Sequence, residues 1–162
     1  MSYTVLNSAM SSTLLSDPEV AGLFSADADL VAMLDFEAAL AEAEAEAGVF
    51  SSRLAQQIAA ACRGFRPDMV RLDAGISRDG MAVPDLVAQL REAIGTEASK
   101  YLHFGATSQD VIDTSLTSRL QRVNQILEPR LLNVCASLAH LDKRFGTHQL
   151  MARTRMQSAL PI

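Results

Sequence analysis

The sequence predicts an all-α protein, in which a small N-terminal helical domain leads into the first long helix of a central helical bundle. Alternating runs of β-branched residues, which indicate strands, are absent, and good helix formers such as Ala, Leu, Glu, Gln and Arg dominate. Apolar residues also recur at intervals of three and four, the period of an amphipathic helix. We expect the N-terminal helical domain at residues 1–105 and the start of the bundle domain at residues 106–162.

The helices of the first domain are predicted from the residues that begin and end them. A polar or hydroxyl residue followed by proline or acidic residues is typical of a helix start, and glycine is typical of the position just after a helix end. The acidic residues Glu42, Glu44 and Glu46 are expected on a solvated helix face. The predicted helices are a short one opened by Asp17-Pro18-Glu19, one from near Asp27 to Gly48, one from Ser51 or Ser52 to near Gly64, one from Asp68 to about Ala74, and one from Pro84 to Gly95.

Two segments are predicted as connections, and the longest helix follows them. Gly75 to Val83 contains the glycines Gly75 and Gly80 and has no firm periodicity, so it is expected to be a loop, and Thr96 to Gly105 is expected to be a short connection. From Ser108 to Phe145 an apolar seam continues over roughly ten turns, with Pro129 expected to kink or briefly break the helix. The seam needs other long helices to cover it, from later sequence or other subunits. It consists of Leu116, Leu120, Val123, Leu127, Leu131, Val134, Leu138 and Leu141.

Composition excludes several classes of protein. The net charge of −5 argues against a basic nucleic-acid surface. Cys62 and Cys135 are far apart and form no CxxC pair, which argues against a disulfide scaffold and a cysteine zinc site. Met1 to Leu15 shows no signal-peptide pattern, and no apolar run reaches the length of a membrane span. We expect a cytoplasmic protein that binds neither nucleic acid nor membrane.

The start of the long helix is a candidate anion site. Gly105 permits a tight turn, and Thr107 with Asp110 fits a capping box. Free backbone N–H groups, the positive end of the helix dipole and the hydroxyl groups of Thr107 and Ser108 could hold a carboxylate or phosphate, with His103 as a further donor. The competing interpretation is a plain helix cap. Of the other histidines, His140 is expected to be structural, and the role of His148 is open.

A second polar cluster lies at Arg153 to Gln157. Two arginines, a threonine and a glutamine within five residues could bind another carboxylate, which arginine can hold through two hydrogen bonds. From composition alone, a solvated polar loop is the competing interpretation.

Together these segments resemble the fumarase/aspartase superfamily. His103 to Thr114, which reads His-Phe-Gly-Ala-Thr-Ser-Gln-Asp-x-x-Asp-Thr, resembles its first signature, and Arg153 to Pro161, Arg-Thr-x-x-Gln-x-Ala-x-Pro, resembles its second. Met33 to Ala41 resembles the first long helix of these enzymes, and Met81 to Val87 resembles the segment before the first signature. The resemblance covers most of the chain and implies the helical fold of these enzymes.

Within the superfamily, the chain is most similar to the bacterial 3-carboxy-cis,cis-muconate cycloisomerases. The lyases usually have a histidine where this chain has Arg155, whereas the cycloisomerases read Ala-Arg-Thr-x-x-Gln, as Ala152 to Gln157 does. Adenylosuccinate lyases also carry an Arg-Tyr pair near the N-terminus, where this chain has Ser11 to Leu15 and no arginine before Arg53. The alternatives are an adenylosuccinate-lyase-like enzyme that releases fumarate and a non-catalytic helical assembly protein.

The resemblance also implies roles for particular residues. Thr107 and Ser108 look like the pair that binds a substrate carboxylate, and His103 looks like the histidine that lines the same pocket. Asp110 and Asp113 are expected to fix the helix start instead. The substrate-binding residues implied are His103, Thr107, Ser108, Thr154, Arg155 (its role open) and Gln157.

The implied chemistry needs no cofactor and no metal. In the cycloisomerases a carboxylate of the substrate, a small polycarboxylate, adds to a double bond of the same molecule and closes a γ-lactone, and charge builds up as an aci-carboxylate before a proton is delivered. The superfamily's catalytic serine lies on a mobile Gly-Ser-Ser loop, which is expected beyond Ile162. Each active site of the superfamily is assembled from three subunits of a homotetramer. We therefore expect this chain to be an N-terminal part, cut at Ile162 and inactive by itself.

Overall fold

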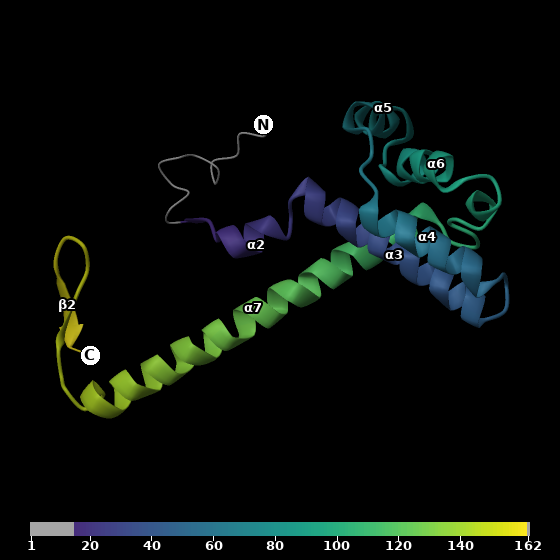
Figure 1. The fold of residues 1–162 in the computed structure, drawn as a ribbon. Coiled ribbons are helices and arrows are strands. Elements are labelled where there is room, and N and C mark those ends of the chain that lie inside the picture. The colour runs from purple at the N-terminus through teal and green to yellow at the C-terminus, as the bar shows by residue number, and fades with distance from the viewer. Residues whose placement is uncertain (1–14, 162) are drawn as a thin grey trace. The chain divides into compact units, whose positions relative to one another are not determined.

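The computed structural model describes residues 15–161 (Figure 1). Helices account for most of these residues, which confirms the predicted all-α class. The chain divides into two compact units within the longest helix, between Val123 and Asn124. The predicted domain limit between residues 105 and 106 stays a prediction. The elements are α2 (Pro18–Gly22), α3 (Ala26–Glu46), α4 (Ser52–Gly64), α5 (Met69–Asp79), α6 (Val83–Ile94), the 3-10 helix η2 (Ala98–Lys100), α7 (Ser108–Phe145), β1 (Met151–Arg153) and β2 (Ser158–Pro161).

Most helix starts follow from local capping. The carboxylate of Asp17 accepts hydrogen bonds from the backbone N–H groups of Glu19 (3.0 Å) and Val20 (3.2 Å), as the predicted N-cap requires. Helix α3 begins one residue before Asp27, because the hydroxyl of Ser25 caps it. These agreements show that the beginnings of α2 and α3 are encoded within a few residues of each start.

The core of the first unit is built by α3, α4 and α6. Helices α3 and α4 run side by side (Figure 1), and their facing side chains are apolar. Ile58 of α4, Leu90 of α6 and Leu102 of the following connection are completely buried. Burial of a large apolar side chain stabilises the fold by roughly 1.5–3 kcal/mol relative to leaving it exposed to water. The connection between η2 and α7 is therefore anchored in the core through Leu102.

The prediction of a loop from Gly75 to Val83 is wrong over most of its length. Helix α5 continues to Asp79, and Gly80, with φ of 76°, ends it in the left-handed conformation. Gly75 lies inside this helix, and α6 approaches so closely there that the position has no room for a side chain. A Cβ at this position would lie 2.6 Å from Cβ of Asp85. The glycine that suggested a loop is therefore a packing residue.

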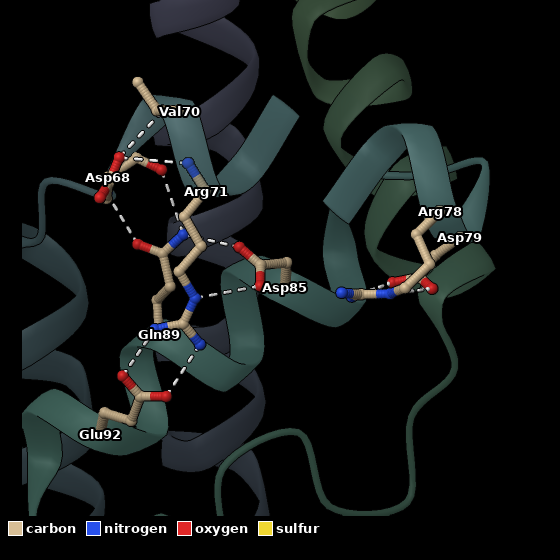
Figure 2. Close-up of polar contacts among 8 residues, drawn as sticks. All are labelled: Asp68, Val70, Arg71, Arg78, Asp79, Asp85, Gln89 and Glu92. Atoms are coloured by element: carbon tan, nitrogen blue, oxygen red, sulfur yellow. Dashed lines mark hydrogen bonds and ion pairs between the residues drawn. The ribbon is translucent and has the colours of Figure 1, made fainter. Parts of the chain in front are cut away.

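A polar network joins α5 to α6 at the same place (Figure 2). Asp85, which is buried, accepts hydrogen bonds from Nε of Arg71 (3.3 Å) and from Nε2 of Gln89 (2.7 Å). Arg71 also donates to both carboxylate oxygens of Glu92 (2.7 and 2.8 Å), and this contact lowers the pKa of Glu92. The backbone N–H of Asp68 donates to Oε1 of Gln89 (2.7 Å). The network fixes the beginning of α5 and the middle of α6 to each other.

The long helix has the limits that the sequence predicts, Ser108 and Phe145. Of the kink or brief break expected at Pro129, the break is absent, because the helix continues through this residue. The second unit then ends in an antiparallel pair of short strands, in which Met151 pairs with Pro161 and Arg153 with Ser158. This small hairpin was not predicted.

The apolar seam of α7 is largely uncovered in this chain. Leu131 and Leu132, for example, are each 63% exposed, whereas Val123 is buried. Soluble proteins rarely leave a continuous apolar surface of this length open to water. The exposed apolar residues of α7 are Leu116, Leu120, Leu127, Leu131, Leu132, Val134, Leu138, Leu141 and Phe145.

Candidate functional site

The start of α7 is a capping box, as the sequence predicts. One carboxylate oxygen of Asp110 accepts hydrogen bonds from the backbone N–H (2.7 Å) and the hydroxyl (2.8 Å) of Thr107. The N–H of Asp110 in turn approaches the hydroxyl oxygen of Thr107 (3.4 Å). These bonds, the backbone one first, hold the pKa of Asp110 below its usual range, and the nearby His103 contributes in the same direction. The helix start therefore stabilises negative charge.

The capping box also decides which donors remain for a ligand. The hydroxyl proton of Thr107 points to Asp110, so this residue is already used in holding the helix start. Ser108 is the first residue of α7 and is half-buried. Further along, Nε2 of Gln109 donates to the carboxylate of Asp113 (2.6 Å), which gives Asp113 a local partner as well. Ser108 is thus the residue of the predicted pair whose hydroxyl the capping box does not use.

His103 lies directly before this helix start and is held from α3. Its Nδ1 lies 2.6 Å from Oε1 of Glu37, and the side chains are only 14% and 2% exposed, respectively. Among the described residues, His103 is the one non-glycine residue with a positive φ, 57°. Gly105, two residues later, has φ of 70° and makes the predicted tight turn.

Glu37 was missed by sequence reasoning. It lies on the buried face of α3 with Met33, Leu34, Ala38 and Ala41, at positions where an apolar residue is expected. A glutamate inside an apolar stripe is a signal that the sequence does contain. Burial of such a carboxylate is costly without a partner, so it points to a bonded role.

The expectation that Glu44 faces solvent is only partly right. Glu44 is half-buried, and its Oε2 is shielded from solvent. Burial raises the pKa of Glu44, and the neighbouring charge of Glu37 adds to this effect. Glu42, by contrast, is exposed and pairs with Arg63 (3.0 Å). The acidic face of α3 is therefore divided between solvent and the neighbourhood of His103.

The second polar cluster forms the turn of the hairpin in the second unit. The backbone N–H of Thr154 donates to the carbonyl oxygen of Gln157 (2.8 Å), and the hydroxyl of Thr154 donates to the same oxygen (3.0 Å). The N–H of Gln157 donates back to the hydroxyl oxygen (3.1 Å). Arg155 and Met156, which is 88% exposed, occupy the two central positions of this turn. Thr154 closes the turn, and Arg155 is presented at its end.

The predicted site residues thus fall into two groups. The structure brings His103, Thr107 and Ser108 together in the first unit. The second unit contains the other group, which consists of Thr154, Arg155 and Gln157. Their predicted roles in binding substrate stay predictions.

The remaining histidines and the cysteines show no comparable arrangement. His140 is exposed, and the ring of His148 lies against Phe145, with centroids 5.9 Å apart. Both cysteines are free thiols. Burial raises the pKa of the Cys62 thiol to about 12, with a further contribution from Glu37, so this thiol is unreactive at neutral pH.

The structure was also searched for groups of metal-ligating side chains and for helices that could cross a membrane. Within residues 15–161, no three His, Cys, Asp or Glu side chains are grouped so that they could hold a metal ion. None of the helices in this range is both long and apolar enough to cross a membrane. The segment Ser11 to Leu14, where the adenylosuccinate lyases have their Arg-Tyr pair, lies outside the described residues.

The sequence and the structure of the chain were compared with known proteins, and the matches agree on one family. A family model for lyases matches residues 15–162. The chain is 38% identical over 143 residues to the 3-carboxy-cis,cis-muconate cycloisomerase of Pseudomonas aeruginosa, which covers 86% of this chain and 31% of that protein. It is 35% identical over 147 residues to an adenylosuccinate lyase of Methanothermobacter thermautotrophicus, which covers 89% of this chain and 32% of the relative.

The structure agrees with these relatives. It matches the crystal structure of the 3-carboxy-cis,cis-muconate lactonizing enzyme of Pseudomonas putida with a TM-score of 0.80 and 37% identity, over 90% of this chain and 34% of that one. The chain therefore spans about a third of the length of the relatives that it matches. From the family model, the relatives and the fold, the chain belongs to the fumarase/aspartase superfamily of lyases.

Proposed function

We propose that this chain is the N-terminal part of a 3-carboxy-cis,cis-muconate cycloisomerase of the cytoplasm. The enzyme would close a lactone within a tricarboxylate, give 4-carboxymuconolactone in protocatechuate degradation, and use no cofactor. The observation that carries the proposal is Arg155 within Ala152 to Gln157, in the place where the lyases that the sequence resembles usually have a histidine. The identity to the cycloisomerase of Pseudomonas aeruginosa supports the same assignment.

The start of α7 would hold one carboxylate of the substrate. It already stabilises the charge of Asp110, and Ser108 stands at its first turn with a hydroxyl that the capping box leaves available. His103 lies beside it with its Nδ1 held by Glu37. Preplaced donors of this kind are what a developing dianion requires, because they need no reorganisation when the charge forms.

The second group would bind another part of the substrate through Arg155. Its exposed guanidinium, at the end of a turn closed by Thr154 and Gln157, can hold a carboxylate through two parallel hydrogen bonds. The catalytic serine loop of the superfamily would come from sequence beyond these residues. The 162-residue chain is accordingly proposed to be inactive by itself.

We also propose that the full-length enzyme is a homotetramer in which α7 joins a bundle of long helices. The exposed seam of α7, including Leu131 and Leu138, supports an interface between helices. A self-associating chain without enzymatic activity at any length would favour the non-catalytic assembly protein instead.

The main alternative is an adenylosuccinate-lyase-like enzyme, and the relative from Methanothermobacter thermautotrophicus keeps it open. The test assays the 162-residue chain and, in parallel, the chain extended in frame as its gene encodes it. Loss of ultraviolet absorbance is followed with 3-carboxy-cis,cis-muconate and with adenylosuccinate. We expect the extended chain to consume the muconate alone. Consumption of adenylosuccinate alone would overturn the assignment, and turnover by the 162-residue chain would refute its proposed inactivity.

A pair of variants in the extended chain tests the proposed carboxylate site. Ser108→Ala should lower kcat/KM while leaving the free energy of unfolding almost unchanged, because the capping box does not use its hydroxyl. Thr107→Ala removes the N-cap and should cost about 1 kcal/mol of stability. Unchanged kcat/KM in Ser108→Ala would reduce this helix start to a cap.

A further inference from the structure

A buried carboxylate on α3 contacts the histidine of the candidate site. Glu37 is 2% exposed and is surrounded on its helix face by Met33, Leu34, Ala38 and Ala41. A carboxylate in such surroundings is strongly disfavoured unless it is hydrogen-bonded or paired. The presence of this carboxylate among apolar residues therefore requires a contact that compensates for its burial.

The hydrogen bond from Glu37 to His103 is that contact. Oε1 of Glu37 lies 2.6 Å from Nδ1 of His103, a short distance typical of bonds that involve a charged group. Within the described part of the chain, Oε2 of Glu37 has no hydrogen-bond partner, and neither has the shielded Oε2 of Glu44. The imidazole of His103 thus supplies the compensation for burying Glu37.

The backbone around His103 indicates that its ring is held in place. His103 adopts a φ of 57°, which residues other than glycine rarely adopt and which persists where the surroundings enforce it. On one side, Leu102 is buried and its carbonyl oxygen accepts a hydrogen bond from Nη2 of Arg91 (3.0 Å). On the other side, Gly105 turns the chain into α7. Glu37 fixes the side chain that these two anchors bring into position.

We propose that Glu37 is a positioning residue, which holds Nδ1 of His103 so that Nε2 is the ring nitrogen presented to a substrate carboxylate. Nδ1–H donates to Glu37 whether the imidazole is neutral or charged. Nε2 of the charged ring can donate to a carboxylate, whereas Nε2 of the neutral ring can only accept a hydrogen bond. Glu37 on α3 contacts the ring directly, and Asp110 on α7 interacts with it through charge; Glu44 on α3 interacts electrostatically with Glu37. The role of Nε2 rests on the proposed function, whereas the tautomer does not.

The test reads the ring nitrogens of His103 directly by ¹H–¹⁵N NMR. Changing the exposed His140 and His148 to Gln leaves His103 as the one imidazole of the 162-residue chain. We expect the proton of the neutral ring on Nδ1, with its resonance shifted far downfield by the carboxylate. A proton on Nε2 instead, with a protonated Glu37 donating to Nδ1, would overturn the proposal without any variant of Glu37.

A variant then tests whether Glu37 is the cause. Glu37→Leu suits the apolar face of α3 and removes the acceptor, so we expect the downfield Nδ1 proton to disappear and the ring to change to the Nε2–H form. Glu46→Leu removes an exposed carboxylate from the same helix and should leave the ring signals unchanged. An Nδ1–H form that survives in a folded Glu37→Leu chain overturns the assignment.

These measurements need no substrate, so their failure is distinguishable from failure of the proposed function. If the Nδ1 proton is found but the extended chain does not form the lactone, only the proposed reaction fails. If Glu37→Leu does not fold, the downfield proton in the background variant still decides whether the carboxylate holds the ring. Backbone amide spectra of each variant establish which case applies.

Discussion

Gly75→Ala is expected to destabilise the first unit, although alanine is the better helix former. Alanine in the interior of a helix gains about 1 kcal/mol over glycine. The added Cβ, however, would lie 2.6 Å from Cβ and 3.1 Å from Cγ of Asp85, closer than carbon atoms can approach. Overpacking of this kind costs roughly 1–3 kcal/mol. We expect a net loss of about 1 kcal/mol, because Asp85 cannot easily move away.

Asp85 is held in place by the network between α5 and α6. Its two carboxylate oxygens are bonded to Arg71 and Gln89, and its side chain is buried (Figure 2). To relieve the contact, α5 would have to shift relative to α6 and strain these bonds. The cost is therefore expected to appear as lost stability.

Gly64→Ala is the matched control. Gly64 is also helical, in α4, but a Cβ there would meet nothing within 4 Å. Urea unfolding followed by far-UV circular dichroism should give unchanged or slightly higher stability for Gly64→Ala. The Tm of Gly75→Ala should be about 2–4 °C below that of the unsubstituted chain, the shift that ~1 kcal/mol produces in a chain of this size. Stability of Gly75→Ala equal to or above that of Gly64→Ala would refute the reasoning.

Three further predictions follow from the described contacts. The depressed pKa of Asp110 means that its contribution to stability is complete above the ordinary aspartate pKa, about 3.9, and is lost as the pH falls through the lower folded value. In urea unfolding between about pH 2 and pH 6, Asp110→Asn should therefore flatten part of the acid slope, and an unchanged slope would contradict this cause. A thiol reagent at neutral pH should label Cys135 quickly and Cys62 only on unfolding, because burial raises the pKa of Cys62 to about 12; Cys135→Ser should abolish the fast phase. The pair Leu131→Glu and Leu138→Glu should shift the chain toward monomer in sedimentation velocity without loss of helix, and unchanged association would remove the seam of α7 as the interface.

The helices were predictable where their ends are encoded locally. The carboxylate of Asp17 and the box formed by Thr107 and Asp110 bond to backbone groups within three residues, so sequence alone reveals them. Gly75 was misread because the same residue that ends helices also permits close packing, and the packing partner Asp85 lies ten residues away. Pro129 was expected to kink or briefly break α7; the helix is not broken there, and the kink stays a prediction.

The candidate site was predictable in part for the same reason. The signature residues from His103 to Ser108 lie together because they are neighbours in sequence. Glu37 was missed because its contact with His103 joins positions 66 residues apart and depends on the packing of α3. The hairpin was missed because it depends on a turn that Thr154 closes with its own hydroxyl, in a segment without strand periodicity.

The two candidate threonines already use their hydroxyl protons within the chain. Thr107 donates to Asp110 and Thr154 donates to the carbonyl oxygen of Gln157, so neither has a proton left for a substrate carboxylate. Beside these threonines, Ser108 and His103 near the start of α7 and Arg155 in the hairpin turn still have groups that can donate to an anion. The threonines would then shape the backbone, and Ser108 and Arg155 would carry the contacts to the anion. It follows that Ser108→Ala and Arg155→Met should raise KM more than Thr107→Ala and Thr154→Ala do, once each variant is compared at a temperature where it is fully folded. The reverse order would show that the threonines exchange their internal bonds for the substrate.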